Sequence, residues 1–395
     1  MLYLILMLLT SVLASIFSLY IIKCKLTSPL SLHTLPWVLV CCIGIITYDS
    51  FIPLSFEVFL SFNIWYLTLF VIFSINEISI RNINSGLIYN NYTFISKRYW
   101  VILIPMSIYT AYEIYIVGNS GANSFLLNLR LAYLDVPDYA GERFKFTQHA
   151  YTFVLAIFII SCITKNKLNL LLSLFWMILF FIASMGKLPI ITVIAIYFVI
   201  YETTKNIKKR RILVVIPIII LTLMILHFLR MSDNDTNTIY SVLGTYIYSP
   251  IVAFGTLSTN TDDTSIGIYT FRFIYAFLYK SGFITEVPTS TILDYVYIPT
   301  PTNVYTAMQP FYSDFSFYGI IFGAIIYGVI YSFIYNLARR GYTLFLLFYA
   351  SMSISLIMSF FAETLLLNLS GNVKLIITIT LLFILTVKCK IKSPY

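Results

Sequence analysis

Apolar runs of membrane-spanning length recur along the whole chain, and they limit its possible folds more than any other feature. A helix needs roughly 20 apolar residues to cross the hydrocarbon core of a bilayer. The chain of 395 residues is 59% hydrophobic and 10% charged, and its mean hydropathy of +0.89 lies far above that of soluble domains. Runs such as 212–229 are apolar on every face instead of alternating, which excludes strands of a barrel. The sequence therefore predicts an all-α polytopic membrane protein with a single integral domain, 1–395.

We expect about 11 transmembrane helices, because the chain contains 11 apolar runs of approximately membrane-spanning length. The runs cover residues 2–22, 35–52, 58–75, 100–118, 148–164, 168–184, 188–204, 212–229, 317–337, 342–360 and 375–387. The first run has no basic segment before it and no small-residue cleavage site, so we expect it to be retained as a span.

Basic residues gather on one side when the runs are connected in order. One set of loops holds most of the 25 basic residues, and the positive-inside rule marks that side as cytoplasmic. These residues are Lys23, Lys25, Arg81, Lys97, Arg98, Lys165, Lys167, Lys205, Lys208, Lys209, Arg210, Arg211, Arg339, Arg340, Lys388, Lys390 and Lys392. The N-terminus is thus expected outside and the C-terminus inside. The net charge of +9 is a topology signal facing anionic membrane lipids, and no nucleic-acid partner is expected.

Two external loops have room for chemistry. The first main loop covers 119–147, and a large loop covers 230–316. Within the large loop, 239–257 and 268–279 are apolar enough to form an extra pair of crossings. We favour helices at the membrane surface, because Pro250 interrupts the first segment and the second is short and contains Arg272. Two further crossings are the alternative.

Cations on the external side run against the positive-inside bias, which makes them candidates for function. They are Arg130, Arg143, Lys145, Lys187, Arg230, Arg272, Lys280 and Lys374. A guanidinium group binds phosphate oxygens bidentately and keeps its charge. We therefore expect Arg130, Arg230 and Arg272 to bind a lipid-linked pyrophosphate, with Arg143 and Lys187 assisting. The alternative is that such residues at helix ends only extend to the membrane interface.

The three histidines show no metal-ligand spacing, and no phosphate-binding or dinucleotide fingerprint is present, so neither a metal nor a cofactor is expected. His149 opens one run and His227 closes another, both on the external side. Either could serve as a general base, as could Asp314. A histidine at a helix end is, however, more often structural.

The segment 299–319, PTPTNVYTAMQPFYSDFSFYG, combines prolines, aromatic rings and polar groups immediately before a span. Aromatic faces beside amides suit sugar rings, because the apolar CH faces stack and the hydroxyls take hydrogen bonds. We expect Asn303, Tyr305, Gln309 and Tyr312 to bind saccharide. The alternative is an aromatic belt at the membrane interface.

The stretches Thr302–Thr306 and Phe311–Phe315, followed by Gly319, resemble a pattern of the Wzy family of oligosaccharide repeat-unit polymerases. The layout of many spans with a smaller and then a larger external loop is also similar to that family. Members can carry an Arg, ten residues and a Gly in each main loop. Arg130 and Gly141 fit this spacing, whereas nine residues separate Arg272 from Gly282.

The resemblance implies a GT-C-like fold and a metal-independent glycosyltransferase of the bacterial inner membrane, with its active site facing the periplasm. Such an enzyme moves a chain from undecaprenyl pyrophosphate onto another undecaprenyl-pyrophosphate-linked oligosaccharide, which builds O-antigen or capsule. The implied partners are these lipid-linked oligosaccharides, a chain-length regulator and a flippase. The alternatives are a flippase or transporter for lipid-linked oligosaccharide, an O-antigen ligase, or a transferase that uses another lipid-phosphate sugar.

Overall fold

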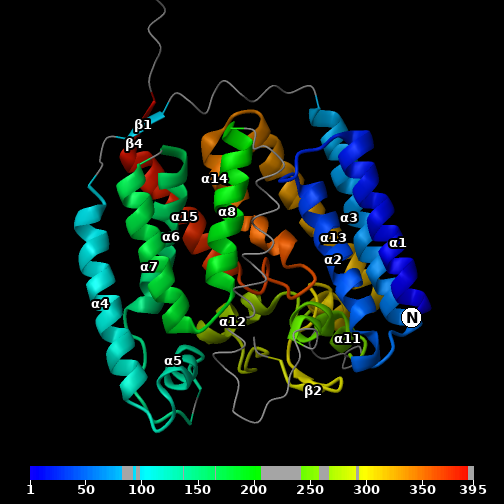
Figure 1. The fold of residues 1–395 in the computed structure, drawn as a ribbon, viewed down its shortest axis with the longest axis horizontal. Helices are drawn as coiled ribbons and strands as arrows, with labels where there is room; N and C mark the ends of the chain where they lie inside the picture. Colours follow the sequence, from blue (N-terminus) through cyan, green and yellow to red (C-terminus); the bar gives the residue numbers. More distant parts are fainter. Residues whose placement is uncertain are drawn as a thin grey trace, which may run out of the picture. The chain divides into compact units, whose positions relative to one another are not determined.

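The computed structural model describes residues 1–81, 92–94, 98–136, 138–164, 166–205, 242–257, 267–290 and 293–389. These residues are almost entirely helical, with only short strands (Figure 1). The chain divides into two compact units. The first unit comprises Met1–Ile83, Asn237–Arg339 and Ser355–Asn372, and the second comprises Asn84–Thr236, Arg340–Ile354 and Val373–Tyr395.

The first unit is a helical bundle in which the N-terminal helices pack with a helix from the second half of the chain. Its elements are α1 (Leu2–Ile16), η1 (Phe17–Ile22), α2 (Pro29–Ile46), η2 (Tyr48–Ser50), α3 (Phe56–Ile80), η5 (Gly244–Tyr248), α11 (Ser249–Phe254), α12 (Arg272–Lys280), β2 (Val296–Tyr297), β3 (Pro301–Thr302) and α13 (Gln309–Arg339). The strands β2 and β3 form a small antiparallel pair.

The second unit is built around α4, α6 and α7, which run side by side (Figure 1). Its elements are β1 (Tyr92–Phe94), α4 (Trp100–Asn119), α5 (Phe125–Tyr133), α6 (Thr147–Thr164), α7 (Lys167–Ser184), α8 (Leu188–Lys205), α14 (Thr343–Ile357, whose end belongs to the first unit), α15 (Leu369–Thr386, whose start belongs to the first unit) and β4 (Val387–Cys389). The strands β1 and β4 pair antiparallel.

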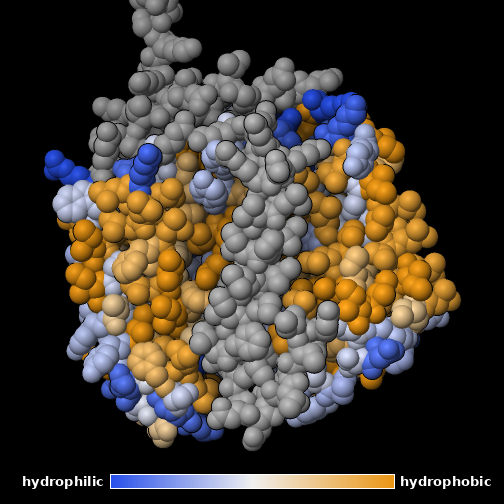
Figure 2. Space-filling model, in the orientation of Figure 1, coloured by the Kyte–Doolittle hydropathy of each residue, from blue (hydrophilic) through white to orange (hydrophobic). Residues whose placement is uncertain are grey.

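The helices confirm the all-α polytopic character expected from the apolar runs. Among the described residues, seven helices are long and apolar enough to cross a membrane, and three further apolar helices are shorter. Every predicted run overlaps a helix except 212–229, which lies outside the described residues, and the number of membrane crossings stays a prediction. Apolar side chains cover the outward sides of the helices, and polar residues gather toward their ends (Figure 2). The inward or outward placement of each loop stays a prediction from charge.

Local capping explains why some helix boundaries differ from the predicted runs. The run 35–52 is occupied by α2, which begins at Pro29 because Ser28 accepts a hydrogen bond from the Ser31 amide and proline suits the first helical position. In the same way, Ser55 caps α3 by accepting a bond from the Val58 amide. These polar caps are weaker signals in the sequence than the apolar residues that follow them.

The core of the first unit lies between α3 and α13. Trp65 on α3 is fully buried, stacks on Phe311 at 6.0 Å between ring centroids and meets the edge of Tyr327 at 5.2 Å. Gly328 lets the two helices approach, because a Cβ atom there would lie 2.7 Å from Ile72 Cδ1. Close packing of this kind fixes the position of α13 relative to α3.

The described part of 239–257 forms η5 and α11, which pack against α2 and α3 with most of their residues buried. Its location at the membrane surface stays a prediction. A break at Ser316 separates the helical residues that begin at Gln309 from the apolar remainder of α13, and the end of the large loop at Ser316 also stays a prediction. Ser316 breaks that helix with φ 54° and ψ −141°, a conformation that costs a residue other than glycine about 1–3 kcal/mol.

Candidate functional site

Arg130 and the turn that carries Lys187 come together in the second unit. Arg130 lies in the last turn of α5, and its Nη1 donates a hydrogen bond of 3.1 Å to the carbonyl of Ser184. Ser184 ends α7, and Lys187 immediately precedes α8. The connecting turn is tight, because Met185 adopts φ 46° and the Gly186 amide donates to Ser184 Oγ at 3.1 Å. Two of the predicted pyrophosphate cations therefore belong to one corner of this unit.

Apolar packing and one asparagine hold α5 in this corner. Leu129 and Ala132 are buried in a cluster with residues of α4 and with Met185. Asn128 donates to the carbonyls of Gly118 and Asn123, each at 3.0 Å. Because the cluster contains residues next to the turn itself, it fixes Arg130 against Ser184 before any ligand is present.

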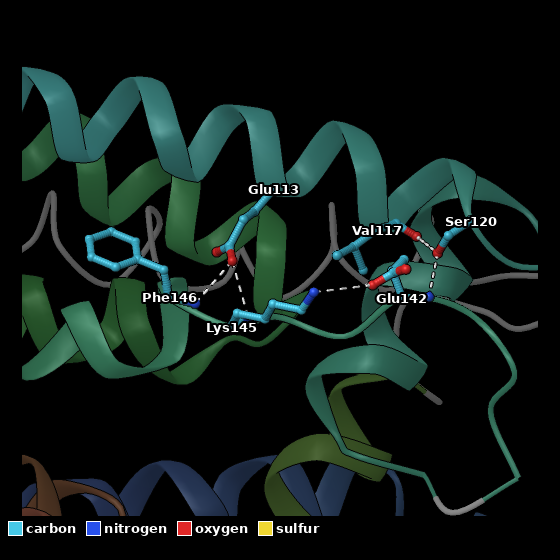
Figure 3. A network of polar contacts seen from close by, with 6 residues as sticks. All are labelled: Glu113, Val117, Ser120, Glu142, Lys145 and Phe146. Carbon is cyan, nitrogen blue, oxygen red and sulfur yellow. Dashed lines mark hydrogen bonds and ion pairs between the residues drawn. The ribbon is translucent and has the colours of Figure 1, made fainter.

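A buried carboxylate joins α4 to the start of α6 (Figure 3). Glu113 is 6% exposed and accepts hydrogen bonds from the amides of Lys145, Phe146 and Thr147 at 3.0, 2.9 and 2.9 Å. The Thr147 hydroxyl adds a fourth bond at 2.5 Å. These amides are the donors that a helix leaves unpaired at its N-terminus, where negative charge is also favoured. Glu113 therefore holds the C-terminal end of the loop 119–147 against α4.

Arg143 and His149 lie in the same unit but have other surroundings. Arg143 forms an ion pair with Asp135 and donates to the Val136 carbonyl at 3.0 Å, and its side chain is 42% exposed. This arrangement stabilises the loop. His149 is exposed in the first turn of α6, just after the segment held by Glu113. Neither residue has a bond to Arg130 among those that the structure gives.

Arg272 begins α12 in the first unit. Its Nε donates to the Thr289 carbonyl at 2.6 Å, and burial lowers the pKa of the guanidinium from its usual value. Since an arginine pKa starts so high, the group remains a cation. The chain enters α12 through Gly267, which has φ 77°. Arg272 is thus partly desolvated and oriented by the loop.

Asp314, a predicted base, is engaged by the segment in front of α12. Its Oδ1 accepts from the Tyr269 amide at 3.2 Å, and its Oδ2 accepts from the Thr270 amide at 2.6 Å. Thr270 Oγ1 also donates to the Pro310 carbonyl at 3.2 Å. These bonds connect the start of α13 to the start of α12.

Three of the four predicted saccharide residues are buried. Tyr305 donates to the Asp294 carbonyl at 3.1 Å, and Gln309 donates to Ser313 Oγ at 3.3 Å. Tyr312 packs between aromatic rings, with the ring of Phe254 5.1 Å away. Asn303 is half-buried. The aromatic faces are used largely for packing, so Asn303 is the member of this set that is most open to a ligand.

Glu363 is a polar site that the sequence interpretation did not select. It is 4% exposed, and its Oε1 accepts from Tyr327 Oη at 2.6 Å and from the amides of Leu365 and Leu366, both at 2.9 Å. The available signal was a single acid in the otherwise apolar stretch FFAETLLL. An acid in such surroundings needs internal partners. The helix in the predicted run 342–360 is α14, which ends at Ile357, before the stretch that contains Glu363.

The predicted pyrophosphate set is divided between the units. Arg130, Arg143 and Lys187 belong to the second unit, and Arg272 belongs to the first. Arg230 and the candidate base His227 lie outside the described residues. Within the described ranges, no group of three or more His, Cys, Asp or Glu residues could hold a metal ion.

A comparison with known proteins finds a partial relative. The chain is 32% identical over 139 residues to a protein from Shigella dysenteriae named "O-antigen polymerase". The match covers 33% of the chain and 33% of the length of that relative. No family model matches the chain. No solved structure matches it either.

Proposed function

We propose that the chain is a glycosyltransferase of the bacterial inner membrane that polymerises undecaprenyl-pyrophosphate-linked oligosaccharide repeat units into O-antigen or capsular polysaccharide. The observation that carries this proposal is the match of 139 residues to an O-antigen polymerase in a chain that is polytopic and helical. An enzyme that lies in the membrane can reach a substrate that its lipid anchors in the same membrane.

The chemistry follows from the cations of the external loops. A hydroxyl at the non-reducing end of one repeat unit attacks the anomeric carbon of the chain on the donor, the bond to undecaprenyl pyrophosphate breaks, and the hydroxyl proton passes to a general base. The predicted candidates for that base are His149, His227 and Asp314. A guanidinium that its own unit holds in place, such as Arg130 against Ser184 or Arg272 against Thr289, can bind the pyrophosphate of the donor bidentately. Lys187, beside the Ser184 turn, supports Arg130.

An oligosaccharide flippase is the second candidate function, since it also needs cations and a sugar-compatible surface. A transporter is expected to bind its cargo near the bilayer midplane through charges on several spans. In this chain, Arg130 and Arg272 lie on the short helices α5 and α12 instead of on long apolar helices. The position of these arginines favours the transferase.

Deletion of the gene in its host separates these functions. We expect lipopolysaccharide or capsule gels to show single-unit products without a ladder, and the wild-type gene to restore the ladder. Loss of all surface units points to the flippase or to a ligase and overturns the proposal. Complementation with Arg130→Ala tests the site, and Lys374→Ala, at another external basic position, is the matched control. If the ladders keep their wild-type length in both Arg130→Ala and Arg272→Ala, these arginines do not bind the pyrophosphate.

A further inference from the structure

Asp314 links two segments of the first unit that are far apart in the sequence. It lies two residues before Ser316, where the helical conformation of α13 is broken. Both of its carboxylate oxygens accept amide bonds, from residues 44 and 45 positions earlier in the chain. Those residues, Tyr269 and Thr270, immediately precede the helix that begins with Arg272. The carboxylate therefore holds the segment that leads into α12.

Further bonds extend this link to the guanidinium. Thr270 Oγ1 donates to the Pro310 carbonyl at 3.2 Å, so the same segment is held twice by the start of α13. Arg272 Nε donates to the Thr289 carbonyl at 2.6 Å. Thr289 Oγ1 in turn donates to the Ile268 carbonyl at 3.4 Å, at the outer limit for a hydrogen bond. Arg272 and its approach segment thus form one closed set of contacts that Asp314 attaches to α13.

The same geometry gives Asp314 a role that requires no proton transfer. Two of its four lone pairs are used by backbone amides, so the side chain has a fixed orientation. Each oxygen of Asp314 already accepts a backbone amide, and the bond to the Thr270 amide is short, at 2.6 Å. Charge-assisted bonds of this kind strongly favour the geometry in which they are formed.

We propose that Asp314 is a positioning residue, which holds α12 so that Arg272 contacts the anionic phosphate end of the lipid-linked substrate. This inference rests on the proposed function. It replaces the predicted catalytic role of Asp314 with an indirect one, exerted through the amides of Tyr269 and Thr270 on Arg272.

The kinetic test uses the full chain in lipid nanodiscs with an undecaprenyl-pyrophosphate oligosaccharide. Asp314→Asn keeps the shape of the side chain but replaces one acceptor oxygen with a donor. We expect KM for the lipid-linked donor to rise about 10-fold, kcat to stay within about twofold, and the pH profile to keep its limbs. Loss of a base instead lowers kcat by about 10²–10⁴-fold and removes a limb of the profile, and that result overturns the positioning role.

A double variant and a control sharpen the result. Arg272→Ala alone should raise KM at least as much as Asp314→Asn, and the double variant should be no worse than Arg272→Ala, because Asp314 acts only through that arginine. Asp294→Asn changes an exposed carboxylate of the same loop and should leave KM unchanged. Fully multiplicative losses in the double variant contradict the proposed link.

A structural measurement separates this inference from the proposed function. Hydrogen exchange of residues 267–280 should be at least 10-fold faster in Asp314→Asn than in the wild type, and unchanged in Asp294→Asn. Equal exchange in Asp314→Asn and the wild type overturns the link between Asp314 and α12. If the wild type forms no polymer, the proposed function fails and the substrate role of Arg272 fails with it. The exchange rates still decide whether Asp314 holds α12.

Discussion

Replacement of Glu113 by Gln tests whether one buried carboxylate holds the loop 119–147 closed. Glu113 is 6% exposed and accepts four hydrogen bonds. Figure 3 shows the two from the amides of Lys145 and Phe146. A glutamine fills the same space, but one of its two terminal groups is a donor. If its oxygen faces the amides of Lys145 and Phe146, its NH₂ group faces the amide of Thr147. That amide then has no acceptor.

The magnitude follows from the number and kind of bonds lost. A hydrogen bond to a charged group contributes about 1.5–3 kcal/mol and a neutral one about 0.5–1.5 kcal/mol, so the two retained bonds lose about 1 kcal/mol each. A buried amide without an acceptor costs roughly 1–3 kcal/mol more. We therefore expect Glu113→Gln to lower the free energy of unfolding by about 3–5 kcal/mol, which is at least roughly 100-fold in the equilibrium constant.

The assay is equilibrium unfolding in mixed detergent micelles, followed by circular dichroism, together with hydrogen exchange at residues 145–150. Glu142→Gln is the matched control, because Glu142 is 56% exposed and its carboxylate meets only the distant, 79% exposed Lys145 Nζ at 3.8 Å among the ion pairs of the described residues. Its loss should cost less than about 0.5 kcal/mol. Equal stability of the two variants would refute the reasoning, because burial and the number of hydrogen bonds would then not affect the free energy of unfolding.

Three further substitutions test other parts of the structure. Tyr327→Phe removes the hydroxyl that donates to Glu363 at 2.6 Å, and we expect about 1.5–3 kcal/mol of destabilisation in thermal unfolding, because the bond is charge-assisted. Gly319→Ala places a Cβ atom in a severe clash with the Phe311 carbonyl oxygen, so α13 must shift and the yield of folded protein in size-exclusion chromatography should fall sharply. Arg143→Ala breaks an exposed ion pair and should cost no more than about 1 kcal/mol, an effect that disappears in high salt.

Control substitutions and contradicting results complete these three tests. Tyr318→Phe removes a hydroxyl from a side chain that is 83% exposed, and it should leave stability unchanged. Gly282→Ala meets no atom within 4 Å, but its φ of 76° should cost about 1 kcal/mol, far less than the clash at Gly319. The bond from Tyr327 to Glu363 is contradicted if Tyr318→Phe destabilises the protein as much as Tyr327→Phe does. The close packing at Gly319 is contradicted if Gly319→Ala folds normally. For Arg143→Ala, the contradicting result is a loss above 2 kcal/mol that persists in salt.

The long apolar helices and their order can be predicted from the sequence alone. The run 100–118 became Trp100–Asn119, and the run 168–184 became Lys167–Ser184. Such runs are readable because a helix satisfies its own backbone hydrogen bonds, so its existence depends on neighbouring residues alone. The charge asymmetry of the loops is equally local, and it gave the predicted orientation.

Tertiary structure decided which polar residues meet. The Arg130 guanidinium bonds to a carbonyl 54 residues away, Asp314 to amides 44 and 45 residues away, and Glu113 to amides more than 30 residues away. Nothing near these residues in the sequence marks their partners. The choice of partner depends on how α3 packs against α13 in one unit and how α4, α6 and α7 pack in the other. Side-chain packing between helices selects these contacts, whereas the apolar runs establish only that the helices form.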